Sequence, residues 1–225
     1  MILIATTKQH NIDNYHKYIK DDYVSELITD KDELNIKKVK ELNPSFIFFP
    51  HWSWIIPKEV YENYECIIFH MTDLPFGRGG SPLQNLIVMG EKETKISALK
   101  ATKELDAGDI YMKMPLSLDG RAQDIYERAS DIIFDNMIKI ILNTTPIPTA
   151  QVGDITSFKR RTAEQSDISK LDSIQKVYDY IRMLDAPSYP HAFIETLNFK
   201  IEFKDAEIKG DIIECKTTIT KKGSK

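Results

Sequence analysis

Two short apolar stretches decide the fold class of this chain: Ser45-Phe46-Ile47-Phe48-Phe49-Pro50 and Cys66-Ile67-Ile68-Phe69. Strands that are apolar at every position, and not only at alternate positions, are typical of parallel sheets buried on both faces. Further apolar runs lie over residues 2–5 and 24–28. Segments of helical character alternate with the apolar runs and lie over residues 14–20, 30–41 and 57–61. This alternation predicts a Rossmann-like α/β fold with an open, mostly parallel sheet and right-handed crossovers.

The rest of the chain predicts a continuation of this fold and a small appendage. The pattern indicates helices over residues 82–88 and 121–142 and strands over residues 94–102 and 110–117. The Thr- and Pro-rich stretch 144–149 breaks the pattern and indicates a boundary. A helix near residues 173–184 and a strand-rich end over residues 193–219 follow. We therefore expect a main domain over residues 1–150 and a small α/β C-terminal subdomain over residues 151–225.

The composition of the 225 residues weighs against several classes of protein. The net charge of −4 argues against a dedicated nucleic-acid binder, which normally has a basic face. Residues 151–225 contain 13 basic and 12 acidic residues, so this part is not a basic module either. The two cysteines, Cys66 and Cys215, are too few for a disulfide scaffold. With no visible signal peptide and no run of about eighteen apolar residues, we expect a cytoplasmic protein without membrane contact.

Two polar clusters are the candidates for chemistry. The first, residues 70–82, begins with His70 directly after an apolar strand, where open α/β sheets bind their ligands. His70 suits a general base, but a histidine that only hydrogen-bonds at a strand end is equally compatible with the sequence. The second cluster, residues 105–110, contains Asp106 and Asp109, which taken alone suit a solvent-exposed turn. Residues 6–11 contain no glycine, which weighs against binding of a nicotinamide dinucleotide.

Together, the two clusters resemble the catalytic domain of the folate-dependent formyltransferases. The matching motifs are His70…Leu74-Pro75, Arg78-Gly79-Gly80-Ser81-Pro82 and Leu105-Asp106-Ala107-Gly108-Asp109. The separation of 36 residues between His70 and Asp106 resembles that of the family's His/Asp pair. Residues 69–86, with weaker support from 158–161 and 178–193, are most similar to sugar N-formyltransferases of the pseudaminic-acid pathway and to formylation domains of peptide synthetases.

This resemblance implies a formyltransferase domain over residues 1–150 and a reaction. The donor would be N10-formyltetrahydrofolate, and a primary amine would attack its formyl carbon. His70 would take the proton of the amine as general base, and Asp106 would orient His70 and favour its protonated form. No metal ion is implied, since the five histidines are scattered and show no spacing typical of ligands.

The resemblance also implies two binding sites. The pterin of the donor would be bound by His51, Trp52, Ser53, Trp54, Ile55, Ile56, Asp106 and Gly108. The acceptor would be contacted by Lys8, Asn11, Thr72, Arg78, Gly79, Gly80, Arg160 and Arg161. For the two tryptophans the alternative is packing in the core. For the polar and charged residues it is an ordinary place at the surface.

One position departs from the family pattern. The family has an asparagine two residues before its histidine, where this chain has Ile68. In relatives that asparagine is credited with binding the oxyanion, and loss of one such donor costs roughly 10²–10³ in rate. We expect a backbone N–H, Thr72 or Asn85 to take over this role.

The sequence favours one acceptor over three alternatives. We expect a nucleotide-linked 4-amino-4,6-dideoxy sugar, carried by UDP and belonging to the pseudaminic-acid route. The near-neutral C-terminal part weighs against methionyl-tRNA, and the short chain weighs against the aminoacyl or peptidyl amine of a peptide synthetase. A non-catalytic folate-binding module is the third alternative, supported by Ile68. The expected partner is thus a nucleotide sugar, with no nucleic acid and no membrane, and a homodimer is left open.

Overall fold

The computed structural model describes residues 1–187 and 189–223, which form two compact units. The first unit consists of Met1–Gly79, Thr94–Leu116 and Tyr126–Ser157. The second consists of Gly80–Glu93, Ser117–Ile125 and Phe158–Lys225. The division into domains 1–150 and 151–225 stays a prediction, because a compact unit does not by itself show which segment folds alone.

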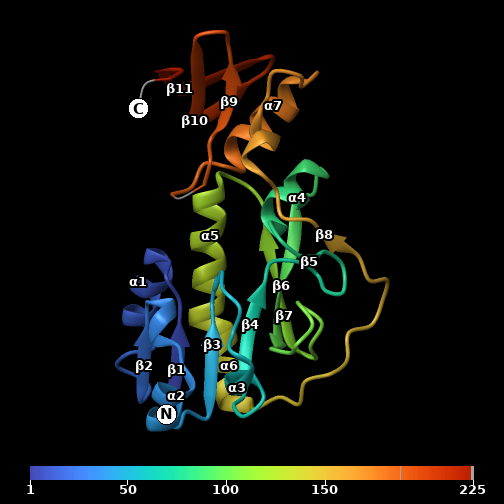
Figure 1. Ribbon diagram of the computed structural model, residues 1–225. Coiled ribbons are helices and arrows are strands. Elements are labelled where there is room, and N and C mark those ends of the chain that lie inside the picture. The colour runs from blue at the N-terminus through green and yellow to red at the C-terminus, as the bar shows by residue number, and fades with distance from the viewer. Residues whose placement is uncertain (188, 224–225) are drawn as a thin grey trace. The chain divides into compact units, whose positions relative to one another are not determined.

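A six-stranded sheet forms the centre of the first unit, in the order β2-β1-β3-β4-β6-β7 (Figure 1). The strands are β1 Ile2–Ala5, β2 Ser25–Ile28, β3 Phe46–Phe49, β4 Cys66–His70, β6 Glu93–Lys100 and β7 Ile110–Ser117. Strand β1 pairs in parallel with β2 and β3, and β3 pairs in parallel with β4, whereas β4 and β6 are antiparallel. The predicted Rossmann-like, mostly parallel α/β fold is therefore confirmed.

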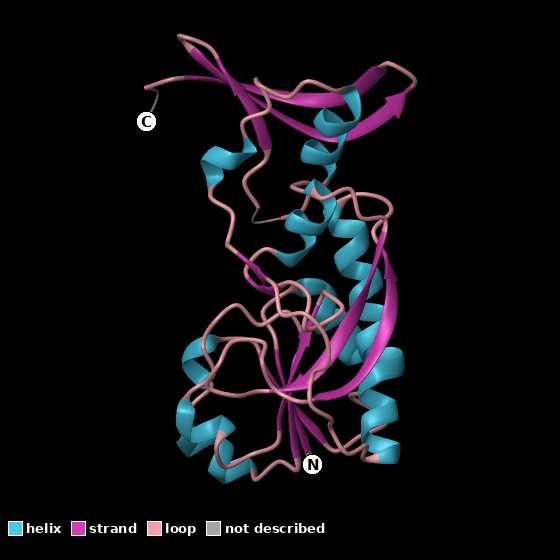
Figure 2. Cartoon of the chain, turned by 90° about the vertical axis from the view of Figure 1, so that its right-hand side faces the viewer, coloured by secondary structure: helices cyan, strands magenta, loops and turns pink. Residues whose placement is uncertain are grey.

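The apolar stretches form the buried middle of this sheet. All four residues of β1 are buried, and Ile47, Phe48 and Phe49 of β3 are at most 1% exposed. Helices lie on both sides of the sheet, which explains why these strands are apolar at every position (Figure 2). The prediction of strands buried on both faces is thus correct for β1 and β3.

The helices of the first unit differ from the predictions mainly at their ends. They are α1 Gln9–Tyr18, η1 Lys31–Glu33, α2 Ile36–Leu42, α3 Lys58–Tyr61, the first-unit part of α5 Ala122–Asp131, η2 Ile132–Met137 and α6 Ile138–Thr144. The predicted helix 30–41 is split because Asn35 caps α2, with its side chain accepting a hydrogen bond from the Lys38 N–H. The predicted helix 121–142 contains a π-helical segment, η2, between α5 and α6.

The expected loop after β4 contains a short strand. Strand β5, Arg78–Gly79, pairs with β8, Ser157–Phe158, in a two-stranded sheet. Next to this pair, the N–H of Arg78 donates to the Thr156 carbonyl oxygen at 3.0 Å. The segment that follows α6 is thereby fixed against the loop that follows His70.

The second unit contains the small α/β arrangement expected near the C-terminus. Its elements are α4 Pro82–Val88, η3 Ala163–Ser166, α7 Ile174–Arg182, β9 Ala192–Glu195, β10 Phe199–Lys209 and β11 Ile212–Lys221. The three strands form an antiparallel sheet in the order β11-β10-β9. The buried Arg182 fixes α7, because its guanidinium binds the Asp179 carboxylate at 2.6 Å and the Leu118 carbonyl oxygen at 2.6 Å.

Candidate active site

The candidate site lies at the carboxyl ends of the parallel strands. The chain runs from β1 to β2 on one side and then crosses back to β3 on the other side of β1. Open α/β sheets bind ligands outside the strand ends at such a change of direction. His70 is the last residue of β4, the next strand along, and Asp106 belongs to the connection between β6 and β7.

His70 is held by the loop that follows it. Its Nε2 atom lies 2.8 Å from the carbonyl oxygen of Gly77. A carbonyl oxygen can only accept, so Nε2 carries a proton and donates it. The opposite nitrogen, Nδ1, faces Oδ2 of Asp106 at 3.6 Å. Both side chains are almost completely buried. Because Nε2 already carries a proton, Nδ1 is the nitrogen that can take up a proton beside the carboxylate.

Asp106 is fixed by its backbone as well as by its side chain. Its φ of 52° lies in the left-handed region, so the turn aims the carboxylate at the loop after β4. There, Oδ2 accepts a hydrogen bond from the N–H of Gly79 at 2.9 Å. In the same turn, a Cβ on Gly108 would lie 1.9 Å from the Lys100 carbonyl oxygen. Only glycine fits at that position, which explains the motif that drew attention to this turn.

Side chains from β6 and β7 hold the loop after His70. Ser97 donates from its hydroxyl to the Thr72 carbonyl oxygen at 2.7 Å. Asp73 forms ion pairs with Lys95 at 2.9 Å and with Lys113 at 2.5 Å. Partial burial raises the pKa of Asp73, but the hydrogen bonds and charges of Lys113 and Lys95 outweigh burial and lower that pKa. Asp73 is thus kept as a carboxylate that anchors the loop.

The residues expected to bind the pterin follow β3 closely. Trp52 makes edge-to-face contacts with Phe49 and Trp54, with ring centroids 6.0 Å and 5.1 Å apart. Its Nε1 atom is buried and has no hydrogen-bond partner among residues 1–187 and 189–223. Ile56 joins the core, whereas Ser53, Trp54 and Ile55 are exposed. Trp52 therefore packs partly in the core and still carries an unused donor.

His51 forms an imidazole and phenol cluster with His10 and Tyr126. The ring of His51 lies 4.8 Å from Tyr126 and 6.1 Å from His10, centroid to centroid. The pKa of His51 is lowered to about 3, mainly by burial and in addition by the positive charge of Lys8 and of a protonated His10. Burial also lowers the pKa of His10. The imidazole of His51 is consequently neutral near pH 7.

Two residues expected to contact the acceptor serve the fold. The buried Asn11 donates from Nδ2 to Thr6 Oγ1 at 3.0 Å and to the Pro50 carbonyl oxygen at 3.1 Å. It therefore ties the end of β1 to the end of β3. Thr72 is fully buried and donates to the Gly77 carbonyl oxygen at 3.4 Å. Lys8, by contrast, is half-buried directly before α1.

Gln151 is the residue that the sequence analysis missed. Its Oε1 accepts from Nε and Nη2 of Arg78 at 3.2 and 2.8 Å. Its Nε2 donates to the carbonyl oxygens of Asp106 and Gly108 at 2.8 and 2.9 Å. A lone glutamine after a Thr- and Pro-rich stretch belongs to no motif quoted above, so no signal in the single sequence pointed to it.

Gly80, Arg160 and Arg161 belong to the second unit. A Cβ on Gly80 would lie 2.7 Å from the Cβ of Arg160, so a side chain there would displace that segment. Arg161 stacks on Tyr180 at 5.3 Å from the ring centroid and donates from Nη2 to the Gln165 carbonyl oxygen. Its Nε is buried and lacks a partner within the described part of the chain. The contacts with Tyr180 and Gln165 indicate that Arg161 helps to hold the second unit together.

Ile68 cannot replace the family's asparagine chemically. It packs against the apolar cluster that includes Phe49 and Ala101. Asn85, one expected substitute, donates from Nδ2 to the carbonyl oxygens of Gly80 and Ser81 at 3.0 Å each, and to Lys159 at 3.2 Å. Its two amide hydrogens are used there. An oxyanion donor from the backbone stays a prediction.

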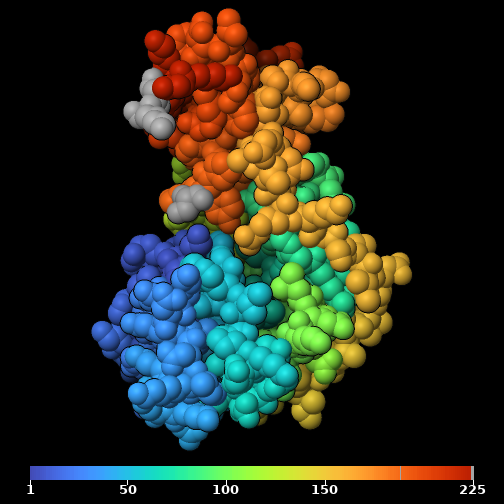
Figure 3. Space-filling model, in the orientation of Figure 1, coloured from blue at the N-terminus to red at the C-terminus, as the bar shows by residue number. Residues whose placement is uncertain are grey.

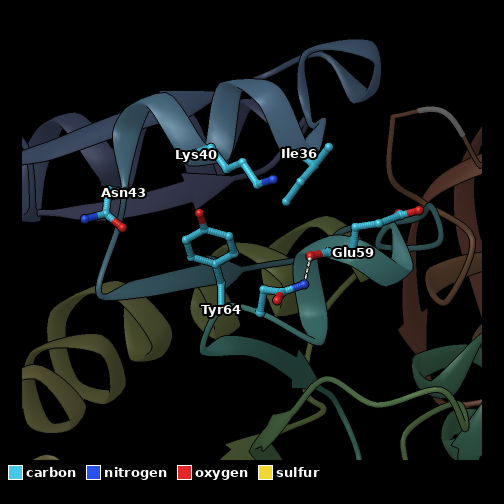
Figure 4. Close-up of a pocket in the computed structure, with 6 residues that line it drawn as sticks. Ile36, Lys40, Asn43, Glu59 and Tyr64 are labelled. Atoms are coloured by element: carbon cyan, nitrogen blue, oxygen red, sulfur yellow. Dashed lines mark hydrogen bonds between the residues drawn. The ribbon is translucent and has the colours of Figure 1, made fainter.

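A separate depression of about 490 Å³ lies near the amino ends of β3 and β4, away from the strand ends that carry His70. It is lined by Ile36, Lys40, Asn43, Glu59, Asn63 and Tyr64, from α2, α3 and the segments before β3 and β4 (Figure 4). Asn43 and Tyr64 precede the amino ends of β3 and β4, whereas His70 ends β4. None of the residues predicted to bind donor or acceptor lines this depression.

The described residues contain neither a cluster arranged to hold a metal ion nor a helix suited to span a membrane. No group of three or more His, Cys, Asp and Glu side chains within residues 1–187 and 189–223 is arranged to hold a metal ion. None of the helices in those same ranges has the length and apolar character needed to cross a membrane. On the face shown in Figure 3, the surface of the first unit consists mostly of N-terminal segments, coloured blue to cyan.

Two protein-family models match the sequence of this chain. The sequence model of the family described as formyl transferase matches residues 7–139. The chain belongs to the formyl transferase family. A second model, described as the C-terminal domain of methionyl-tRNA formyltransferase, matches residues 163–220. The family inferred from the His70, Arg78 and Asp106 motifs is therefore confirmed.

Solved and curated members of the family support this assignment. The structure of a methionyl-tRNA formyltransferase from Clostridium thermocellum is 52% identical, covers 98% of both chains and gives a TM-score of 0.96. A curated methionyl-tRNA formyltransferase from Thermodesulfovibrio yellowstonii is 29% identical over 82% of this chain and 60% of its own length. The chain thus spans about 60% of the length of the curated relatives that it matches.

A more distant structure shares the fold alone. HypX from Aquifex aeolicus in complex with tetrahydrofolic acid is 19% identical, with a TM-score of 0.75 over 91% of this chain and 37% of its own. This likeness supports the α/β architecture of the first unit and its mostly parallel sheet.

The expected acceptor must be corrected. The curated relatives and the 52% identical structure are methionyl-tRNA formyltransferases, so a nucleotide-linked sugar as acceptor, with no nucleic-acid partner, is wrong. The prediction gave too much weight to the near-neutral charge of residues 151–225. Net charge averages over a whole segment, whereas a phosphate is bound by a few cationic groups in a particular arrangement.

Proposed function

We propose that this protein transfers the formyl group of N10-formyltetrahydrofolate to the amine of methionyl-tRNA. The observation that carries the proposal is the buried contact of His70 with Asp106 in a chain that is 52% identical to a methionyl-tRNA formyltransferase over 98% of its length. The match of residues 163–220 to the C-terminal domain of such enzymes supports the same acceptor. The cytoplasm, where aminoacylated tRNA is used, is the expected compartment.

His70 acts as the base at its Nδ1 atom. The Gly77 carbonyl oxygen holds the proton on Nε2, which leaves the lone pair of the neutral ring on Nδ1. When the amine nitrogen bonds to the formyl carbon, it must lose a proton, and Nδ1 takes it. General-base catalysis of this kind contributes typically about 10²–10⁴ in rate.

Asp106 stabilises the positive charge that His70 then carries. Its Oδ2 lies 3.6 Å from Nδ1 and is held in place by the Gly79 N–H. Because both side chains are buried, little water screens their attraction. The breaking of the bond between the formyl carbon and N10 leaves an amine on the folate, which can take the proton from Nδ1. His70 returns to its starting state.

The residues after β3 fit a folate. The buried Nε1 of Trp52 has no partner among residues 1–187 and 189–223, and a flat heterocycle offers ring acceptors to such a donor. The exposed rings and side chains of Trp54 and Ile55 provide apolar surface beside it. The bound folate supplies the activated formyl group. The chain's own residues orient it and move the proton.

The proposal is tested by incubating the full chain with N10-formyltetrahydrofolate and methionyl-tRNA and measuring formyl-methionine released by mild hydrolysis. We expect product with the wild type and a loss of at least about 10²-fold with His70→Ala. His16→Ala is the matched control, since His16 is exposed on α1. Absence of product with the wild type, or full turnover with His70→Ala, would contradict the proposed function.

A further inference from the structure

Arg78 occupies a special place between the two catalytic side chains. Its neighbour Gly77 binds Nε2 of His70 through its carbonyl oxygen, and its neighbour Gly79 binds Oδ2 of Asp106 through its N–H. Arg78 therefore lies in the chain between the residue that binds His70 and the residue that binds Asp106. The direction of its side chain is then decided by Gln151.

The partner of Arg78 is a neutral amide. Oε1 of Gln151 accepts from Nε and Nη2 of the guanidinium, the geometry in which a carboxylate often binds arginine. No carboxylate in the described ranges 1–187 and 189–223 forms an ion pair with Arg78, and its Nη1 has no hydrogen-bond partner there. The guanidinium thus has a fixed direction and a charge that is not neutralised. Its Nη1 atom makes no hydrogen bond within the described residues.

The other half of the Gln151 amide binds the catalytic turn. Nε2 donates to the Asp106 and Gly108 carbonyl oxygens, so each hydrogen-bonding group of this side chain is in use. The chain around Gln151 is fixed at both ends: Thr149 and Ile110 exchange backbone hydrogen bonds of 2.8 and 2.9 Å, and Thr156 accepts from the N–H of Gly77 at 2.7 Å. Gln151 therefore couples Arg78 to the turn that carries Asp106.

We propose that Gln151 is a positioning residue that presents the un-neutralised guanidinium of Arg78 to a phosphate of the RNA acceptor and ties it to the Asp106 turn. This inference rests on the proposed function, because it takes the anion to be a backbone phosphate next to the aminoacylated end. Glutamate could not replace Gln151. It would neutralise Arg78 and place carboxylate oxygens against two carbonyl oxygens.

Two variants separate the two parts of the proposal. Gln151→Glu keeps an acceptor for Arg78 but neutralises its charge; because it also loses the donor to the Asp106 and Gly108 carbonyl oxygens, only its RNA binding is used. We expect about tenfold weaker RNA binding and a salt dependence, as log Kd against log salt concentration, that is smaller by about one phosphate contact. Gln151→Met keeps the charge of Arg78 but loses the hydrogen bonds that join Arg78 to the turn with Asp106 and Gly108. We expect an unchanged salt dependence and a kcat lower by about 10–100-fold, since small misplacements of catalytic groups cost this much.

The experiment uses the full chain and two separate measurements. Binding of an unacylated RNA hairpin that copies the acceptor stem is followed by fluorescence anisotropy over a series of KCl concentrations. Formylation of methionyl-tRNA gives kcat and KM. Gln9→Glu, on the exposed face of α1, makes the same change of charge and is the control. Melting temperatures identify a variant that fails to fold, and a double-mutant cycle with Arg78→Met then tests the coupling in the variants that do fold.

The outcomes are distinct. An equal salt dependence in wild type and Gln151→Glu, or no RNA binding by the wild type, overturns the phosphate contact. Full kcat in Gln151→Met, or losses in the Arg78→Met cycle that simply add, overturns the positioning role. RNA binding that loses one contact in Gln151→Glu, combined with no formyl-methionine from the wild type, would instead contradict the proposed function and the positioning role and would support the phosphate contact alone.

Discussion

Oδ2 of Asp106 lies 2.9 Å from the N–H of Gly79 and 3.6 Å from Nδ1 of His70, so one carboxylate oxygen serves both the loop and the base. The first contact fixes the oxygen without using a positive charge. The second leaves its negative charge available to the imidazole. In the proposed reaction, Asp106 therefore stabilises a protonated His70 without moving.

Replacement of Asp106 by asparagine tests the charge separately from the shape. Asp106→Asn retains an oxygen that can accept from the Gly79 N–H but loses the negative charge beside Nδ1. We expect kcat to fall by about 10²–10⁴, with little change in melting temperature. Initial rates of formyl transfer at saturating donor measure this effect. Asp109→Asn, an exposed aspartate in the same turn, should keep its turnover, and equal losses in both variants would refute a special role for Asp106.

Gly108 should not tolerate a side chain. The Cβ of an alanine at this position would overlap the Lys100 carbonyl oxygen, so the turn with Asp106 must shift. We expect Gly108→Ala to lower the free energy of unfolding by about 1–3 kcal/mol and to reduce turnover. Urea unfolding and initial rates measure the two effects. Gly90→Ala is the comparison, because nothing lies within 4 Å of its added Cβ and only its φ of +85° opposes the change.

His51 should make the protein less stable in acid. Its pKa of about 3 in the folded chain is lower than the value of about 6.5 expected after unfolding. Between these values the unfolded state binds more protons, so the contribution of His51 is complete above pH 6.5 and is lost as the pH falls towards 3. We expect His51→Gln to flatten this loss in urea unfolding at pH 7 and pH 4.5. His16→Gln serves as control, and parallel pH profiles for His51→Gln and wild type would contradict the argument.

Lys113 should affect turnover through the loop that follows His70. Its Nζ atom binds the Asp73 carboxylate and the Leu74 carbonyl oxygen, so Lys113→Met releases one side of this loop. We expect kcat to fall by about tenfold, because Gly77 in the same loop fixes the proton on His70 Nε2. Lys113→Arg should restore part of the rate. Lys92→Met, an exposed lysine before β6, is the control, and a loss that the arginine variant does not recover would count against a role for the charge.

The fold was predictable because burial leaves a clear pattern in the sequence. The apolar stretches 45–50 and 66–69 became β3 and β4, and the strand over residues 110–117 was placed without error. His70 and Asp106 were identifiable as candidate site residues through the local motifs around them. Gln151 was not, because its importance depends on contacts with residues 45 and 73 positions away in the chain.

The substrate was the part that composition could not decide. A net charge of +1 over residues 151–225 was read as evidence against RNA, although the binding of a phosphate depends on the arrangement of a few cationic groups and not on net charge. Asn11 shows the reverse case. It was expected to contact the acceptor, but its amide spans the ends of β1 and β3 within the fold. A polar residue after a strand cannot be assigned to ligand or to fold without its neighbours.

The position of Gln151 has a consequence for the minimal catalytic fragment. The family match ends at residue 139, and a cut at the Thr- and Pro-rich stretch would end near residue 150. A fragment made at either point would retain His70, Arg78 and Asp106 but would lack the amide that joins Arg78 to the Asp106 turn. Fragments for engineering or for transplanting this site onto another scaffold should therefore extend at least to Thr156, whose backbone and hydroxyl complete the attachment.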